Sequence, residues 1–159
     1  MVLPVVYVDL DGVLAEFPES LADVDSTIAE ACKRWCEATG EHHSDFEGLF
    51  ATIQPKEGAS EAIRRLMLKF DVYVLTSAPW KNISSWSDKR IWVEKFLPEL
   101  PRKKLILTHD KSLNRGAYLI DDRTKNGALE FDDYEGQELI LFGAEKYPDW
   151  ESVLEYLNC

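Results

Sequence analysis

The chain has 159 residues, 45% of them hydrophobic and 11% aromatic, which is enough apolar material for the core of one globular domain. Its 29 acidic and 18 basic residues give a formal net charge of −11. This charge argues against a broad polynucleotide-binding face, which needs many cationic contacts with phosphates. It does not argue against one small anionic ligand. Three cysteines, no leader-like start and no apolar run of membrane-spanning length favour a cytoplasmic protein without a membrane partner.

The apolar run 5–8 predicts a buried strand, and two carboxylates, Asp9 and Asp11, stand where it ends. Ligands of open α/β sheets bind beyond the carboxyl ends of the strands, so these acids occupy a position where chemistry is done. Neighbouring carboxylates repel each other, and such pairs commonly hold a metal ion, share a proton or handle a phosphoryl group. A calcium loop is excluded because apolar residues 13–15 stand where further oxygen ligands would be needed.

The remaining elements alternate between strand and helix. Continuous apolar runs, typical of parallel strands covered on both faces, predict strands at 72–75, 105–107, 117–120 and 138–142. Helical spacing of apolar residues predicts helices at 58–70, 86–97 and 150–157. Segment 122–136 is rich in Asp, Asn, Gly and Lys and is expected to be a long loop. The alternation predicts an α/β fold with a Rossmann-like, doubly wound parallel sheet.

Residues 16–57 interrupt this alternation. Apolar residues within them recur at three- and four-residue spacing and indicate a small helical insertion, for which Gly40 is a natural stop: Leu21, Val24, Ile28, Ala31 and Trp35. We therefore expect residues 1–159 to form a single domain in which 16–57 are a small helical cap over the strand ends. Such a cap could act as a lid that excludes water, or it could be a packing element with no gating role.

Polar side chains follow four of the predicted strands: Asp9 and Asp11, then Thr76 and Ser77, then Lys111, then Asp121 and Asp122. Because parallel strands end at one edge of the sheet, these groups should meet around one crevice. The combination suits phosphoryl transfer. A carboxylate can attack phosphorus, Mg²⁺ on oxygen ligands can offset the repulsion between nucleophile and phosphate, and a lysine with hydroxyl groups can hold the remaining oxygens.

In four motifs, in the expected order, the chain resembles the haloacid dehalogenase-like (HAD) phosphatases: Asp9-Leu10-Asp11-Gly12-Val13, Thr76-Ser77, Lys111 and Leu119-Ile120-Asp121-Asp122-Arg123. Finer details resemble the 5′(3′)-deoxyribonucleotidase group: Phe17, Thr76-Ser77-Ala78-Pro79, Asp88-Lys89-Arg90-Ile91-Trp92-Val93 and Asp110-Lys111-Ser112. The resemblance covers most of the chain except the inserted segment. That segment is shorter than in the animal enzymes of the group and has no obvious aromatic cluster.

The resemblance implies roles for the acidic residues. Asp9 would be the nucleophile and a Mg²⁺ ligand. Asp11 would be the general acid and base, and its backbone carbonyl would also bind the metal. Asp122 would complete the protein ligands of the metal, and Asp121 would support them from beside.

The resemblance also implies a set of substrate contacts. Thr76, Ser77 and Lys111 would hold the phosphate, with Lys111 balancing the charge of the nucleophile. Phe17 resembles an aromatic residue that packs against the nucleoside. Base and sugar preference stay open, because such contacts come largely from the inserted segment.

We therefore expect a Mg²⁺-dependent phosphomonoesterase that hydrolyses nucleoside monophosphates, deoxyribonucleotides foremost, through a phosphoaspartyl intermediate. Two alternatives remain: a phosphatase of the same mechanism acting on another small ester such as a sugar phosphate, and a nucleotide-binding protein without turnover. A signalling receiver domain fails because its phosphate-accepting aspartate ends a middle strand, whereas the order here is acid, hydroxyl, lysine, acid pair. No polynucleotide partner is expected, and the oligomeric state stays open, with a homodimer as one option.

Other prominent side chains have structural interpretations. Cys32 and Cys36 stand near two histidines, but their four-residue spacing on a helix matches no common structural zinc site, so we interpret them as small hydrophobic residues. His109 is expected to form a local hydrogen bond. The tryptophans are expected to pack in the core or the cap, Trp80 and Trp92 among them.

Overall fold

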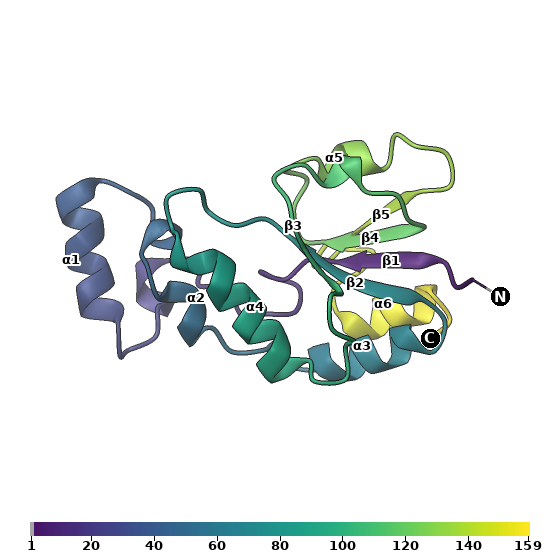
Figure 1. Cartoon of the computed structure of the whole chain (residues 1–159), viewed down its shortest axis with the longest axis horizontal. Coiled ribbons are helices and arrows are strands. Elements are labelled where there is room, and N and C mark those ends of the chain that lie inside the picture. Colours follow the sequence, from purple (N-terminus) through teal and green to yellow (C-terminus); the bar gives the residue numbers. More distant parts are fainter. Residues whose placement is uncertain (1) are drawn as a thin grey trace.

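The computed structural model describes residues 2–159 and shows a parallel sheet with helices on both faces (Figure 1). Within the described residues the sheet has five strands in the order β3-β2-β1-β4-β5. Their bounds are β1 Val5–Val8, β2 Asp71–Thr76, β3 Leu105–Leu107, β4 Tyr118–Asp121 and β5 Glu138–Leu141. Each strand was predicted from its apolar run, and the Rossmann-like fold class is confirmed.

The longer helices of the core follow their predicted segments: α3 Ala59–Met67, α4 Ser84–Phe96 and α6 Trp150–Tyr156. In Figure 1, α3 and α6 lie together against one face of the sheet, and α5 (Ala128–Phe131) lies on the other. A single 3₁₀ turn, η3 (Lys111–Leu113), follows β3. None of the helices in the described part of the chain combines the length and apolar character that a membrane crossing requires.

Both faces of the sheet are apolar because both are covered. Val6 and Val8 of β1 point into the main core, which includes Ile63 of α3 and Leu154 of α6. Residues of the opposite alternation form a second cluster with α5: Tyr7, Leu75, Leu119, Ala128 and Phe131. The strands are apolar at successive positions because both faces of the sheet are buried.

The expectation of a long loop over 122–136 is wrong in its middle, where α5 forms one turn. Gly127, at φ 77°, begins this turn. Ala128 and Phe131 are three residues apart and both bury against the sheet. Four residues are too few to show helical periodicity in a sequence, and tertiary packing alone stabilises so short a helix.

The inserted segment 16–57 contains η1 (Leu21–Asp23), α1 (Ala29–Thr39), η2 (His43–Asp45) and α2 (Leu49–Thr52). It lies beyond one end of the sheet in Figure 1, with α1 farthest from the strands and α2 beside α4. The segment is thus helical in several places, but its helices are shorter than the sequence pattern suggested.

The helical pattern that begins at Leu21 is confirmed only from Ala29, where α1 begins, to Gly40, which caps its C-terminus. Ser20 and Asp23 exchange side-chain and backbone hydrogen bonds that close η1 as a separate turn. The backbone is then extended at Val24. Short polar side chains of this kind compete with helix formation by bonding to the local backbone. As a result Leu21 is exposed, and α1 buries Cys32 instead of Ala31.

The end of β1 fixes where its carboxylates lie. The Asp9 N–H donates to the Ile120 carbonyl at 2.8 Å, so β1 stays paired with β4 through Asp9. The next residues turn at once, because the N–H groups of Leu14 and Ala15 both donate to the Leu10 carbonyl at 2.9 Å. Asp11 therefore projects from a tight turn at the central strand of the sheet.

Gly12 in this turn has φ 79°, and a Cβ built on it would lie 2.1 Å from Asp122 Oδ2. Glycine is needed here for its left-handed backbone and for the close approach of the Asp122 carboxylate, which directly follows β4. The turn after β1 and the end of β4 thus touch through a residue with no side chain.

We expect Gly12→Ala to lower the free energy of unfolding more than Gly40→Ala, although Gly40 has a similar φ of 73°. A Cβ at Gly40 meets nothing within 4 Å. Its cost should be the left-handed strain alone, about 1 kcal/mol. Gly12→Ala must also displace the Asp122 carboxylate and should cost about 2 kcal/mol or more. Urea unfolding measures both, and equal losses would contradict the packing of Asp122 on Gly12.

Candidate functional site

The ends of β1, β2 and β4, together with η3, line a cavity of about 360 Å³. Most of the residues predicted for the site line it: Asp9, Asp11, Phe17, Ser77, Lys111, Asp121 and Asp122. Thr76 is placed differently. It is fully buried, its hydroxyl donates to the Ser77 carbonyl at 3.2 Å, and it lies behind Ser77 instead of facing the cavity.

Lys111 connects the first and fourth strand ends. Its Nζ lies 2.9 Å from Asp9 Oδ1 and 2.5 Å from Asp121 Oδ2, and its side chain is almost fully buried. Burial lowers the pKa of Lys111, but the charges of Asp9 and Asp121 outweigh this effect and the net pKa is raised. Lys111 therefore stays cationic and stabilises two carboxylates at once.

The carboxylates at this end of the sheet are crowded. Asp9, Asp121 and Asp122 each place an oxygen within 4.8 Å of the other two. Burial, followed by the negative charge of Asp9, raises the pKa of Asp121 to about 7 and that of Asp122 to about 6. A raised carboxyl pKa means that the protein around it disfavours the anion. Burial and the charge of Asp9 thus outweigh the charge of Lys111 at both groups and that of Arg123 at Asp122, which act in the opposite direction.

A divalent cation fits the cluster. Both oxygens of Asp121 have partners, since Oδ2 pairs with Lys111 and Oδ1 accepts the Arg123 N–H at 3.0 Å. Asp122 Oδ1, in contrast, is buried without a hydrogen-bond partner among residues 2–159. Oxygen-only ligands of this kind match Mg²⁺, and a cation beside Asp9 and Asp122 would offset their repulsion.

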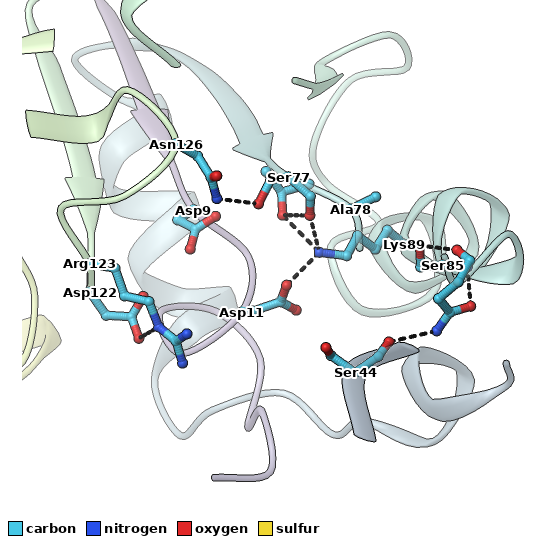
Figure 2. Close-up of polar contacts among 12 residues, drawn as sticks. Asp9, Asp11, Ser44, Ser77, Ala78, Ser85, Lys89, Asp122, Arg123 and Asn126 are labelled. Atoms are coloured by element: carbon cyan, nitrogen blue, oxygen red, sulfur yellow. Dashed lines mark hydrogen bonds and ion pairs between the residues drawn. The ribbon is translucent and has the colours of Figure 1, made fainter. Parts of the chain in front are cut away.

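Lys89 on α4 is a site residue that the sequence reasoning did not assign. Its side chain is 0% exposed, and Nζ forms an ion pair with Asp11 Oδ2 (Figure 2). Nζ also donates to Thr76 Oγ1 at 3.0 Å and to the Ser77 carbonyl at 2.5 Å. One cation from the helix thus holds the second carboxylate of β1 and the end of β2.

This ion pair leaves one oxygen of Asp11 available. Oδ1 is buried and has no partner in the described part of the chain. Burial raises the pKa of Asp11, the charge of Lys89 lowers it, and the charge of Asp9 adds to the rise; the net pKa is raised. Asp11 is therefore oriented through one oxygen while the other can exchange a proton.

A sequence signal for Lys89 existed. The buried residues of α4 include Ser85, Lys89 and Trp92, which are four and three residues apart and share one face. Ile91, next to Trp92 in the sequence, is 57% exposed. A lysine on the apolar face of a helix is rarely fully buried unless it is paired. The pattern points to a buried acidic partner but does not say which one.

Aromatic side chains line the outer part of the cavity. Phe17 stacks on His43 with ring centroids 5.7 Å apart and lies 5.9 Å from the Phe50 ring. Trp80 also lines the cavity, at 80% exposure, so its expected role in core or cap packing is wrong. Trp80 contacts His109, whose Nε2 lies 2.8 Å from the Ala78 carbonyl, which confirms the expected local bond of His109.

The inserted segment is fixed to the core by buried polar contacts. The Asn82 amide nitrogen donates to the Ser44 and Phe46 carbonyls, both at 2.9 Å, and Asn82 itself is fully buried. Next to it, the Gly48 N–H donates to Ser84 Oγ at 2.9 Å. These bonds join residues 44–48 to the beginning of α4, the helix that carries Lys89.

We expect Lys89→Met to reduce stability by about 3 kcal/mol, because removing one partner of a buried ion pair leaves the other uncompensated. The replacement keeps the length of the side chain but loses all of its hydrogen bonds. Lys95→Met on the same helix is the matched control, since Lys95 is exposed. Chemical unfolding of both variants is the measurement. Equal stabilities would show that the Lys89–Asp11 pair contributes nothing to folding.

The family model and the similar proteins point to the same family. Residues 3–148 match the family described as 5′ nucleotidase, deoxy (pyrimidine), cytosolic type C protein. A Vibrio phage KVP40 protein, provisionally named as a 5′(3′)-deoxyribonucleotidase, is 44% identical over 156 residues, covering 98% of this chain and 85% of the phage protein. The 5′(3′)-deoxyribonucleotidase of Bacillus subtilis is 30% identical over 116 residues, covering 73% of this chain and 63% of its own length.

A solved structure from Burkholderia xenovorans LB400, provisionally named as a haloacid dehalogenase-like hydrolase, has the same fold. It aligns with a TM-score of 0.56 over 92% of this chain and 85% of its own, at 11% identity. This likeness concerns the fold alone, while the sequence match carries the family. The resemblance deduced from the motifs is confirmed: the chain belongs to the 5′ nucleotidase, deoxy, cytosolic type C family and is a phosphoric monoester hydrolase of the HAD type.

Proposed function

We propose that the protein hydrolyses nucleoside monophosphates, with deoxyribonucleotides as its main substrates, through phosphorylation of Asp9. The observation that carries the proposal is the surroundings of Asp9. Its Oδ1 lies 2.9 Å from the Lys111 ammonium, and the Asp122 carboxylate stands beside it with a buried oxygen that has no hydrogen-bond partner among residues 2–159. A nucleophile, a charge-balancing lysine and a carboxylate able to bind a metal ion in one cavity suit phosphoryl transfer. The names of the relatives support the class of substrate.

Mg²⁺ would be held by the carboxylates of Asp9 and Asp122 and by the Asp11 backbone carbonyl. Asp121 would act from beside, by keeping Lys111 in place. A bound Mg²⁺ offsets negative charge on the phosphate and polarises its oxygens. The charge balance supports a divalent ion, because the cluster disfavours its own anions.

In the first step, an oxygen of Asp9 attacks phosphorus and the bond from phosphorus to the ester oxygen breaks. Asp11 gives its proton to the departing nucleoside oxygen. Lys89 keeps the Asp11 carboxyl group aimed at that oxygen through Oδ2, while Oδ1 carries the proton. The raised pKa of Asp11 is in line with a group that begins the reaction protonated.

In the second step, water attacks phosphorus and the bond to Asp9 breaks, which releases inorganic phosphate. Asp11 takes the proton of the water and returns to its starting form. Ser77 and Lys111 would hold the other phosphate oxygens in both steps, because both line the cavity. Thr76 would contribute from behind, through its bonds to Lys89 and to the Ser77 carbonyl.

We also propose that residues 16–57 act as a cap within one domain formed by the whole chain. Phe17, supported by His43 and Phe50, would give the nucleoside an aromatic wall. The buried bonds of Asn82 to residues 44 and 46 favour a cap that is fixed to the core at that point.

A substrate panel tests the proposal. We expect phosphate release from deoxyribonucleoside monophosphates to exceed release from ribonucleotides and from sugar phosphates, and to stop when Mg²⁺ is chelated. The panel should include 5′ and 3′ esters and a generic aryl phosphate. A clear preference for a sugar phosphate would overturn the substrate class but keep the mechanism. Release that continues under chelation would refute the need for a metal.

Replacing the nucleophile gives a second test. Asp9→Asn should reduce turnover by about a thousandfold or more, because a carboxamide oxygen is a poor nucleophile. The fold should persist, since the change also removes a charge that repels Asp121 and Asp122. Asp133→Asn, at an exposed aspartate, is the control. Phosphate release measures turnover, and circular dichroism checks that the fold persists. Normal turnover of the Asp9→Asn enzyme would show that Asp9 is not the nucleophile.

A further inference from the structure

Asn126 lies between β4 and α5 and has a left-handed backbone, with φ 54°. Non-glycine residues seldom adopt this conformation, although asparagine tolerates it better than most. The residue lines the cavity but belongs to none of the motifs that carry the family resemblance. An uncommon backbone conformation at a site is a reason to ask what it holds in place.

The side chain and the backbone of Asn126 contact two different strand ends. Its amide nitrogen donates to Ser77 Oγ at 3.1 Å, as Figure 2 shows. Its carbonyl accepts the Lys111 N–H at 2.7 Å. Ser77 follows β2 and Lys111 begins η3, so one residue ties together the two groups proposed to hold the phosphate.

The hydrogen bond to Ser77 has a direction with a chemical consequence. A hydroxyl group has one proton to donate and can also accept. Because Asn126 donates to Ser77 Oγ, the Ser77 proton does not serve this bond and can point into the cavity, toward a phosphate oxygen. An aspartate at the same place would accept that proton and turn it away from the cavity.

The next residue lets this contact form. A Cβ on Gly127 would lie 2.2 Å from Asp110 Oδ1 and 2.8 Å from the Lys111 nitrogen. The backbone at 126–127 can therefore approach η3 closely only with glycine at 127. The left-handed turn at Asn126 directs its carbonyl to Lys111 and its amide to Ser77.

We propose that Asn126 is a positioning residue for phosphate binding, which orients the Ser77 hydroxyl and holds the backbone of Lys111. This inference rests on the proposed function, in which Ser77 and Lys111 bind phosphate. Asn126 itself need not touch the substrate. The effect of its side-chain amide should therefore pass through Ser77 and vanish when the Ser77 hydroxyl is absent.

A double-mutant cycle tests the coupling. Asn126→Gly suits the left-handed backbone and keeps the carbonyl that binds Lys111, so it deletes only the amide. Calorimetric titration of inorganic phosphate with Mg²⁺ present should show affinity weakened by about three- to tenfold, the range of one hydrogen bond. In a Ser77→Ala background the same change should cause no further weakening. A merely structural role would act equally in both backgrounds.

Asn158→Gly is the matched control. Asn158 also has a left-handed backbone, with φ 55°, but lies next to the chain end, and its substitution should leave phosphate affinity unchanged. Equal weakening by Asn126→Gly with and without the Ser77 hydroxyl, or no weakening at all, would overturn the inference. Wild-type protein that binds phosphate but hydrolyses no nucleotide would overturn the proposed function alone. Wild-type protein that binds no phosphate would overturn both.

Discussion

The structure depends on balancing buried negative charge at the carboxyl ends of β1 and β4. Four carboxylates and two buried ammonium groups share this space: Asp9, Asp11, Asp121, Asp122, Lys89 and Lys111. If these six groups are all ionised they carry a net charge of −2, part of which is offset by Arg123, 3.8 Å from Asp122 Oδ2. Burial, followed by the negative charge of Asp9, raises the pKa of both Asp121 and Asp122, so their surroundings disfavour the anions. The proposed phosphoryl transfer depends on this negative charge, because it favours binding of a divalent cation beside Asp9 and Asp122.

The two buried lysines pair with different carboxylates and connect different elements of the fold. Lys111, from the segment after β3, pairs with Asp9 and Asp121 and so joins the central strand to β4. Lys89, from α4, pairs with Asp11 and joins the turn after β1 to the end of β2. Neither lysine lies on the strands that carry the acids. The correct charge balance therefore forms only when helix, turn and sheet are all in place.

Close backbone approaches keep this arrangement compact. Gly12 lets Asp122 lie against the turn after β1, and Gly127 lets Asn126 lie against η3. Asn82 gives the inserted segment a buried attachment to α4 through the carbonyls at 44 and 46. The inserted segment is thus attached at the beginning of the helix whose Lys89 pairs with Asp11. The aromatic wall at Phe17 and the exposed ring of Trp80 stand at the outer end of the same cavity.

The sequence by itself determined the strands, the α/β class and the motif residues, because apolar runs and strand-end polar groups are local patterns. It also placed Asp9, Asp11, Lys111 and Asp122 around one cavity, since parallel strands share an edge. Local patterns did not reveal the partners of Lys89, Asn82 and Asn126, which lie 78, 38 and 49 residues away in the chain. They also misjudged 21–28 and 122–136, where capping bonds and packing overrode periodicity. Only the tertiary structure decided these contacts, because they depend on which distant segments meet.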